Sequence, residues 1–457
     1  MCGTEWWKMN VRLSEIARAV GGVVTGPDRE VHGIVTDNRE IKNGYTLFCA
    51  IRGARVDGHD YVAKVLEDAT CSALVDDVRF SYPGTVLVDD VVSAIARIGE
   101  YWRRVHISDV CLVGVTGSVG KTTAKEMIRS ALSSRRVYCS FGNRNSRISA
   151  PLALTEVPDG TEFMVSELGM SEKGEMETLS RVVRPDICVI TNIGSAHIEQ
   201  LGSKEAILRE KLSIAAHMRD GGKLVLNYDD ELLRRECARE NCVTYGFSGG
   251  AALHPETFEE NTDGSVFTLA GDPLRIEFRV RVPGRHNVLN ALAAIAVADL
   301  LGISRKDAAQ GLELFRPGGM RQNVYMTSGI RVIADCYNAS PESMDAALSV
   351  LCSYNGRRIA VLGDMLELGS FSEAAHRKVG ESARAKGVDE LLCLGKYSQS
   401  LCEGYGGGTS FAQDDRNAMI SYIKRLVRKG DTVLFKASNA MRFHEIIAES
   451  GLAHKDE

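Results

Sequence analysis

The sequence predicts an α/β protein of three domains whose sheets are largely parallel and covered by helices on both faces. Apolar segments that are typical of buried parallel strands alternate along most of the chain with segments of helical period. The chain has 457 residues, which is too long for one hydrophobic core. In addition, a glycine-rich turn joins one buried strand directly to a helix, a connection that is typical of phosphate-binding sheets.

We expect domain boundaries that divide the chain into residues 1–105, 106–317 and 318–457. The first segment is a small α/β domain with short strands and no catalytic pattern, so taken alone it is typical of a binding module. The second contains strand-like runs such as Phe163–Glu167 and Lys223–Asn227, with an antiparallel excursion expected at residues 244–281. The third is expected to be a second doubly wound, Rossmann-like domain because two of its predicted strands end at a glycine, Gly363 and Gly395.

The composition argues against several classes of protein, among them nucleic-acid-binding, membrane-inserted and zinc-binding proteins. The 44% hydrophobic and 25% charged fractions are ordinary for a soluble globular protein, and a net charge of −5 gives no electrostatic reason to expect nucleic acid or an anionic membrane as a partner. No apolar run approaches ~18 residues, so no membrane insertion is expected. The N-terminal residues lack a signal-peptide pattern, and the twelve cysteines include no Cys-x-x-Cys pair. We therefore expect a cytoplasmic monomer with reduced thiols and no zinc.

The stretch from Val110 to Ser130 carries the strongest chemical signal. Val110–Val115 is a buried-strand run, residues 116–120 contain two glycines, and a helix is predicted from Thr122 onward. Backbone N–H groups and the helix dipole would converge on phosphate there, Lys121 would reach the β- and γ-phosphates, and the Thr122 hydroxyl would ligate Mg²⁺. The usual pattern has a glycine at Val115, and an ordinary glycine turn is the alternative. The expected nucleotide contacts are Thr116, Gly117, Ser118, Gly120, Lys121, Thr122 and Thr123.

Two further side chains follow strands of the same predicted sheet. Glu167 closes one strand and His197 follows another, so both are expected at the sheet edge that carries the phosphate loop. A carboxylate and an imidazole at that edge could hold Mg²⁺ against the phosphates. The alternatives are a capping or surface carboxylate for Glu167 and a hydrogen-bonded loop histidine for His197.

Pattern alone says less about other polar residues. Lys211 reads as a solvated helix lysine. Asn287 and Asn290 could read an adenine edge or cap their helix. Asp335 precedes a polar loop that could be a second-substrate site or a simple turn.

The motifs taken together resemble the Mur ligase family. GVTGSVGKTT, SELGM, NIGSAHIEQLGS, GRHNVLNALAA, DCYNASPESM and VLGDMLELG occur in the order and spacing of that family. The N-terminal TDNREIKNGYTLFCAIRGARVDGHDYV resembles the UDP-substrate domain of one subgroup, which adds D-alanyl-D-alanine to UDP-N-acetylmuramoyl-tripeptide. The resemblance covers nearly the whole chain.

The resemblance implies an ATP- and Mg²⁺-dependent amide ligase that works through an acyl phosphate. It implies that Thr122 and Glu167 hold one Mg²⁺, that His197 binds a second, and that Lys211 is carbamylated into an anionic ligand. It places the nucleotide against Asn287, Asn290, Arg321 and Asp335, with Lys121, Lys211, His197 and Glu167 as the catalytic set. Substrate contacts are expected from Asn38, Arg39, Asn145, Arg147, Asn338 and Ser340.

Several residues depart from the family pattern. Ser146, Arg147 and Ser149 replace an asparagine, an acidic or amide residue and a glycine in a segment that faces the UDP-sugar. Asn439 stands in place of an arginine that could fork onto an anion, and Asn38 replaces a serine. These departures leave two alternatives open: a paralogue that joins other substrates, or a nucleotide-binding regulator that has lost ligation.

Overall fold

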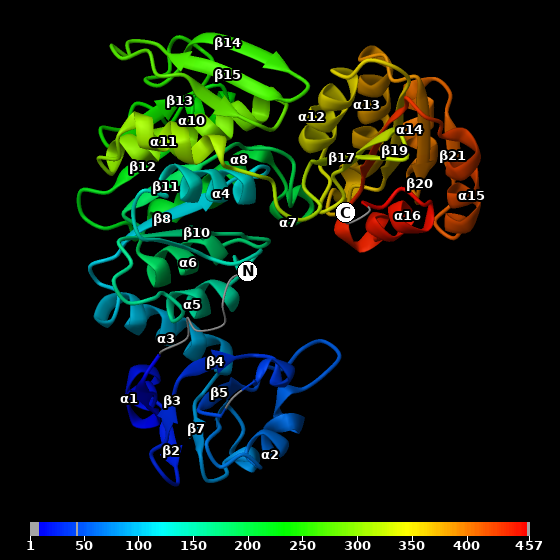
Figure 1. The fold of residues 1–457 in the computed structure, drawn as a ribbon. Coiled ribbons are helices and arrows are strands. Elements are labelled where there is room, and N and C mark those ends of the chain that lie inside the picture. Colours follow the sequence, from blue (N-terminus) through cyan, green and yellow to red (C-terminus); the bar gives the residue numbers. More distant parts are fainter. Residues whose placement is uncertain (1–8, 43, 455–457) are drawn as a thin grey trace. The chain divides into compact units, whose positions relative to one another are not determined.

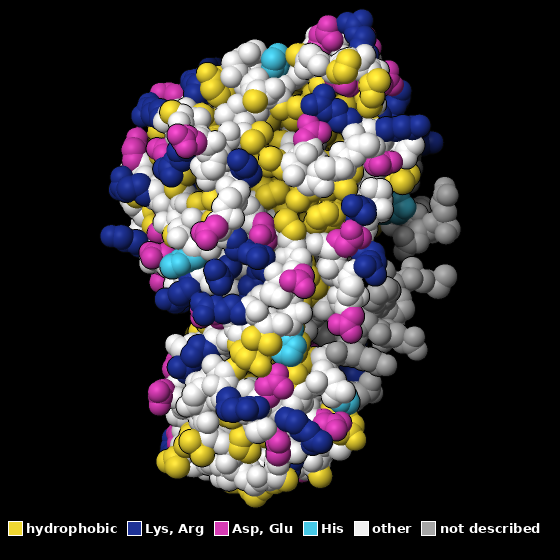
Figure 2. Space-filling view, turned by 90° about the vertical axis from the view of Figure 1, so that its left-hand side faces the viewer, with side chains coloured by type: hydrophobic (Ala, Val, Ile, Leu, Met, Phe, Trp, Pro, Cys, Tyr) yellow, Lys and Arg dark blue, Asp and Glu magenta, His cyan; other side chains and the backbone are white. Residues whose placement is uncertain are grey.

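The computed structural model describes residues 9–42 and 44–454 as a set of sheets with helices packed against them (Figure 1). Two compact units are distinguished within it: residues 1–116, 135–189 and 210–224 form one, and residues 117–134, 190–209 and 225–457 form the other. The predicted α/β class is confirmed, whereas the three domain boundaries stay a prediction. Figure 2 shows basic and acidic side chains interspersed over most of one face.

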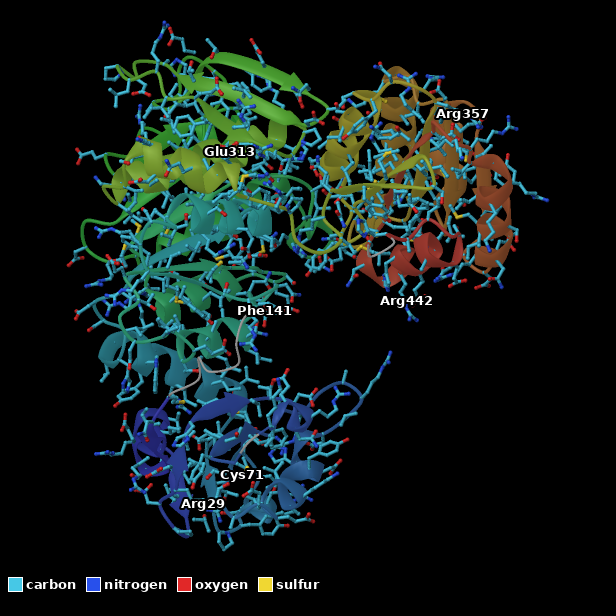
Figure 3. The ribbon with its side chains drawn as sticks, viewed as in Figure 1. Arg29, Cys71, Phe141, Glu313, Arg357 and Arg442 are labelled. Carbon is cyan, nitrogen blue, oxygen red and sulfur yellow. The ribbon has the colours of Figure 1, made fainter. Side chains whose placement is uncertain are left out.

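The first sheet has five short strands in the order β2-β7-β6-β5-β4. Strands β4 to β7 pair in parallel, and β2 adds antiparallel to β7 at the edge. The Arg29 guanidinium donates to the carbonyl oxygen of Cys71; both residues are labelled in Figure 3. The strands are β2 (Val23–Thr25), β4 (Gly33–Val35), β5 (Thr46–Cys49), β6 (Ser72–Val75) and β7 (Thr85–Leu87), with the ribbon β1 (Val11–Arg12) and β3 (Glu30–Val31). The helices are α1 (Leu13–Val20), α2 (Val62–Val65) and α3 (Val91–Val105), with short 3₁₀ turns η1 (Asn38–Glu40), η2 (Gly58–Tyr61) and η3 (Val78–Phe80).

The second sheet carries the glycine-rich turn and has the order β13-β12-β11-β8-β10-β9. Strands β8 and β10 run parallel with Glu167 beside Val115, so Glu167 lies level with the end of the strand that leads into the turn. The strands are β8 (Cys111–Thr116), β9 (Val137–Cys139), β10 (Phe163–Glu167), β11 (Ile187–Ile190), β12 (Lys223–Asn227) and β13 (Cys242–Tyr245). The helices are α4 (Lys121–Ala131), α5 (Ser149–Leu154), α6 (Glu175–Val183), α7 (Ile198–Leu201), α8 (Lys204–Leu212), η4 (Ser213–Ala215) and α9 (Glu231–Arg234).

The expected antiparallel excursion is confirmed as a three-stranded sheet, β14-β15-β16. The apolar helix that follows it begins at Arg285, and it packs against α4. The elements are β14 (Pro255–Asn261), β15 (Gly264–Leu269), β16 (Phe278–Val280), α10 (Arg285–Leu300) and α11 (Arg305–Glu313).

The last sheet has the order β17-β18-β22-β19-β20-β21 and is parallel except for the antiparallel edge strand β17. Its apolar interior includes Val332, Val361 and Phe435. The strands are β17 (Asn323–Thr327), β18 (Ile330–Ala334), β19 (Arg358–Gly363), β20 (Glu390–Leu394), β21 (Thr409–Phe411) and β22 (Thr432–Lys436). The helices are α12 (Pro341–Cys352), η5 (Gly369–Phe371), α13 (Ser372–Ala385), α14 (Ser398–Tyr405), α15 (Arg416–Leu426), η6 (Asn439–Met441) and α16 (Phe443–Glu449). Across the described ranges, none of the helices has the length and apolarity needed to cross a membrane.

A buried arginine ties α3 to the second sheet. Arg103 is 2% exposed, and its guanidinium donates to Asp186 Oδ2 at 2.9 Å. The same oxygen accepts the Leu112 N–H of β8 at 2.7 Å. Burial lowers the pKa of Arg103, and the hydrogen bonds of its guanidinium offset this cost and stabilise the buried positive charge. The remaining acceptors are the carbonyl oxygens of Ile107, Val110, Val183 and Arg184.

Replacing this arginine should destabilise the fold strongly. We expect Arg103→Ala to lower the free energy of unfolding by about 3–5 kcal/mol, because the Asp186 carboxylate loses its buried charged partner and several carbonyl oxygens lose a donor. The adjacent Arg104 is half-exposed and pairs with Glu100 one helical turn away, so Arg104→Ala should cost only about 0.3–0.5 kcal/mol. Urea unfolding of both variants measures the difference; equal losses would contradict the assigned role.

Candidate active site

The turn after β8 can be made only with glycine at two positions. A Cβ at Gly117 would lie 1.9 Å from Thr191 Oγ1. Gly120 has a φ of +83° and precedes the first residue of α4, a conformation that costs other residues energy. The close approach of the Gly117 backbone to Thr191, the residue that follows β11, therefore fixes the path of the loop.

The segment that follows β11 holds the loop in place. The Ser118 N–H donates to the Asn192 carbonyl oxygen at 3.0 Å, and the Val119 N–H donates to Asn192 Oδ1 at 2.9 Å. In return, Thr191 Oγ1 donates to the Val119 carbonyl oxygen at 2.6 Å, and the Gly194 N–H donates to Ser118 Oγ at 2.8 Å. Sequence reasoning missed Thr191 and Asn192, although Asn192 opens the NIGSAH motif that ends in His197 and Thr191 stands directly before it.

The donors at the start of α4 suit a phosphate group. The first turn of α4 contains no acidic residue, and its N-terminus carries the positive end of the helix dipole. Lys121 Nζ donates to the carbonyl oxygens of Gly117 at 2.8 Å and Ser118 at 3.3 Å, so its charge lies over the loop. Thr122 and Thr123 follow on the same turn, and the wholly buried Thr116 ends β8 just before it. This donor set fits a nucleotide phosphate chain, with Thr122 as an oxygen ligand for Mg²⁺.

Glu167 is buried rather than a surface or capping carboxylate. It ends β10, is 2% exposed, and Oε1 accepts a hydrogen bond from Asn145 Nδ2 at 2.7 Å. The predicted substrate residue Asn145 thus orients the predicted metal ligand. Carboxylate oxygens are the ligand type that Mg²⁺ prefers, so the position and orientation of Glu167 suit a metal ligand.

The reading of Lys211 as a solvated helix lysine is wrong. Its side chain is 1% exposed, and it lies near the end of α8. The preceding Glu210 is also buried and accepts the N–H groups of Gly174 and Met176 at 3.0 Å, which fixes this end of α8. Helical period could not reveal this burial, because α8 has no clear apolar face along which to place Lys211.

His197 is held by a carboxylate that sequence reasoning did not assign. His197 has a left-handed φ of +63°, and Nδ1 lies 2.8 Å from Oε2 of Glu367. Glu367 also has a φ of +63°. Such a backbone costs a non-glycine residue about 1–3 kcal/mol and is often found at functional sites. The close contact with the His197 imidazole lowers the pKa of Glu367, and the positive charge of Lys121 adds to this effect.

A second carboxylate fixes the same loop two residues earlier. Glu342 Oε1 accepts the Ser195 N–H at 3.0 Å and the Ser195 hydroxyl at 2.9 Å. A Cβ at Gly194 would lie 2.8 Å from the Glu342 carboxyl carbon, so glycine is needed for this approach. Glu342 belongs to the first turn of α12, just after the YNASP motif.

The predicted adenine contacts do not cap their helix. The residue that precedes α10 is Gly284, and no side chain caps this end. Asn287 Nδ2 donates to Pro283 O at 2.8 Å and to Gln322 Oε1 at 2.9 Å. Asn290 lies against the phosphate loop, since a Cβ at Gly120 would be 3.0 Å from Asn290 Oδ1.

A buried ion pair shapes the loop after β18. Lys436 is 2% exposed, and Nζ donates to Asp335 Oδ2 at 2.7 Å and to the Asn338 carbonyl oxygen at 3.0 Å. The Arg321 guanidinium stacks over the Tyr337 ring, 3.5 Å from its centroid. Ser340 accepts the Ser343 N–H as the N-cap of α12, so its hydroxyl already has a structural partner.

The remaining predicted substrate residues lie on exposed turns. Asn38 and Arg39 form η1, and the Arg39 side chain is 85% exposed and pairs with Asp37. Arg147 is half-exposed, and Nε lies 3.0 Å from Glu175 Oε1. The residues on either side close a small turn through the hydroxyls of Ser146 and Ser149, 3.0 Å apart.

A glycine loop between a parallel strand and the lysine- and threonine-bearing start of a helix, with a second α/β sheet beyond it, defines the chain as a nucleotide-dependent α/β enzyme. Residues 115–298 match the family model of the Mur ligase middle domain, and residues 320–439 match that of the Mur ligase, glutamate ligase domain.

Full-length relatives agree. The chain is 36% identical over 453 residues to the UDP-N-acetylmuramoyl-tripeptide--D-alanyl-D-alanine ligase of Bacillus subtilis (strain 168), covering 96% of this chain and 97% of that one. It is similar to a crystal structure of MurF from Acinetobacter baumannii, with a TM-score of 0.90, 29% identity, and coverage of 97% and 99%. It is also similar to MurF ligase from Thermotoga maritima in complex with ADP, with a TM-score of 0.82, 27% identity, and coverage of 92% and 97%. The chain belongs to the Mur ligase family, as the motifs indicated.

A buried neutral histidine supports the loop that carries Glu367. His376 is fully buried; Nε2 accepts the Met365 N–H at 2.9 Å and Nδ1 donates to the Ser372 carbonyl oxygen at 2.6 Å. Burial lowers the pKa of His376. Protonation would remove the acceptor for Met365, two residues before Glu367.

The stability of the protein should therefore depend on His376 at mildly acidic pH. The unfolded chain takes up a proton near pH 6.5, before the folded state does, so this contribution is complete above about pH 6.5 and is lost as the pH falls toward the folded pKa. We expect His376→Gln to flatten the fall in urea midpoint between pH 7 and 5. The exposed control His444→Gln should keep the wild-type slope; identical slopes in all three proteins would contradict this role.

Proposed function

We propose that the chain is a cytoplasmic, monomeric ligase that adds D-alanyl-D-alanine to UDP-N-acetylmuramoyl-tripeptide at the expense of ATP, in peptidoglycan precursor synthesis. The observation that carries the proposal is the phosphate loop with buried Glu167 and Lys211, found in a chain whose full-length relative bears this activity in its name. The Thermotoga maritima relative binds ADP, which supports ATP as the nucleotide.

The proposed reaction has two steps. A carboxylate oxygen of the tripeptide attacks the γ-phosphorus of ATP, and the bond to the leaving ADP oxygen breaks as an acyl phosphate forms. The dipeptide amine then attacks the acyl carbon, loses a proton, and displaces inorganic phosphate to leave the amide. Lys121 and the N–H groups at the start of α4 stabilise the charge on the transferring phosphoryl group.

The metal ligands that we propose come from four side chains. Thr122 and Glu167 would hold one Mg²⁺, and His197 with carbamylated Lys211 would hold a second. Held by these residues, Mg²⁺ would supply positive charge that offsets the charge on the phosphate oxygens. The burial of Glu167 and Lys211 supports this assignment because a ligand set is more selective when water is excluded from it.

Further contacts follow from the family resemblance. We propose that Asn287, Asn290, Arg321 and Asp335 contact the nucleotide, and that Asn338 and Ser340 lie on the dipeptide side. The UDP-substrate side is assigned to Asn38, Arg39, Asn145 and Arg147, and domains to residues 1–105, 106–317 and 318–457. A paralogue with another acceptor is the second candidate, because Arg147 and its neighbours depart from the family pattern.

The central test is ADP release with UDP-N-acetylmuramoyl-tripeptide and D-alanyl-D-alanine, each omitted in turn. We expect turnover only with both, and a loss of at least about 10²-fold in Lys121→Ala, because the lysine charge acts mainly on the transferring group. Arg129→Ala, on the exposed side of the same helix, is the matched control and should keep wild-type turnover. Full activity of Lys121→Ala would refute the phosphate-loop assignment.

Arg147 should alter acceptor binding rather than ATP use. Its guanidinium is half-exposed, so it can give a charged hydrogen bond to a substrate carboxylate or phosphate worth about 1–3 kcal/mol. We expect Arg147→Gln to raise KM for the UDP substrate about tenfold while KM for ATP stays nearly constant. The exposed Arg181→Gln on α6 serves as the control. Unchanged constants would mean that Glu175 is the only partner of Arg147.

A further inference from the structure

The loop that carries His197 is fastened by residues from the last third of the chain. Ser195 gives two hydrogen bonds to Glu342, and His197 Nδ1 lies 2.8 Å from Glu367 Oε2. The backbone joins in as well: the Glu199 N–H donates to the Glu367 carbonyl oxygen at 3.4 Å. Both carboxylates therefore act on one short segment, residues 194–199.

The local backbone is built for this contact. His197 and Glu367 both have a φ of +63°, although neither is glycine. Glycine allows close approach on either side: a Cβ at Gly194 would lie 2.8 Å from the Glu342 carboxyl carbon, and one at Gly369, whose φ is +52°, would lie 3.0 Å from Glu199 Cγ. A strained pair that faces each other across two such close approaches indicates a geometry that the surrounding structure enforces.

The position of a carboxylate beside an imidazole determines which of the two ring nitrogens carries the proton. A histidine ring has two nitrogens, and the one that donates a hydrogen bond to a carboxylate carries the proton. The other nitrogen then keeps its lone pair and faces away from the carboxylate. A carboxylate behind a histidine in this way fixes the tautomer and raises the basicity of the ring toward a metal.

We propose that Glu367 is a positioning residue that holds His197 with its proton on Nδ1, so that Nε2 is presented to the divalent cation. The inference rests on the proposed function, since it takes His197 as a ligand of Mg²⁺. Glu342 supports it by fixing the backbone at Ser195. Glu367 itself touches neither nucleotide nor substrate in this assignment; it acts through His197.

The tautomer can be read in the full-length protein without any ligand. In ¹⁵N-histidine-labelled protein, the His197 signals are assigned by their loss in His197→Gln. We expect wild type to show a protonated Nδ1 and an unprotonated Nε2. Glu367→Ala should show a mixture of tautomers, whereas Glu367→Gln, which keeps an acceptor oxygen, should retain the wild-type form. Glu373→Ala removes an exposed glutamate of α13 and is the matched control.

Metal affinity is the second measurement, with Mn²⁺ as the probe. Titration followed by electron paramagnetic resonance in the presence of ADP should give a Kd for Mn²⁺ that is about 10- to 100-fold higher in Glu367→Ala than in wild type. Glu367→Gln should fall between them, and Glu373→Ala should match wild type. If Glu367→Ala does not fold, Glu367→Gln decides alone: a wild-type Kd overturns the proposal, and a severalfold higher Kd supports it.

The results separate this inference from the proposed function. Neither measurement uses the UDP substrate or the dipeptide, so a failure of ADP release would not affect them. A wild-type tautomer and wild-type Mn²⁺ affinity in Glu367→Ala would overturn the role of Glu367. Tighter Mn²⁺ binding in Glu367→Ala would also overturn the proposed role of Glu367, because it would show that the carboxylate competes with the cation for His197.

Discussion

The shape of the phosphate loop depends on hydrogen bonds to Thr191 and Asn192, the two residues that directly follow β11. Asn192 accepts the Ser118 N–H and the Val119 N–H, while Thr191 returns a hydrogen bond to the Val119 carbonyl oxygen. The loop has little freedom to adapt when phosphate arrives, because the contacts that shape it come from the protein. Less of the binding free energy is then lost to ordering the loop, so the ligand binds more tightly. The same strand end continues into the loop that carries His197, so one segment supports both the glycine loop and the histidine loop.

Much of this could be predicted from the sequence, because buried parallel strands are short apolar runs with sharp ends. Phe163–Glu167 and Lys223–Asn227 are strands with the predicted limits. The edge strand β17 (Asn323–Thr327) was not predicted, since its residues are only half-buried and follow no strict alternation. An edge strand is decided by its neighbour, which local pattern does not contain.

In the candidate site too, residues placed by a local motif could be predicted from the sequence, whereas contacts with distant residues could not. Lys121 and Thr122 are placed by a local motif, and the sequence predicted their positions at the start of a helix. The burial of Lys211 and the contact of Glu367 with His197 depend on residues far away along the chain, and neither periodicity nor spacing reports such contacts. Arg147 illustrates the same limit, because its partner Glu175 is the first residue of α6, far along the chain, and offsets part of its charge.

The fastening of Ser195 by Glu342 spans 147 residues of sequence, which sets an order of events during translation. At roughly 5–20 residues per second, a ribosome needs about 7–30 s to extend the chain from one partner to the other. Throughout that interval the nascent chain contains its complete phosphate loop but not the carboxylates that seat the histidine loop. The histidine loop therefore takes up the geometry described here only after α12 has been synthesised, late in the folding of the chain.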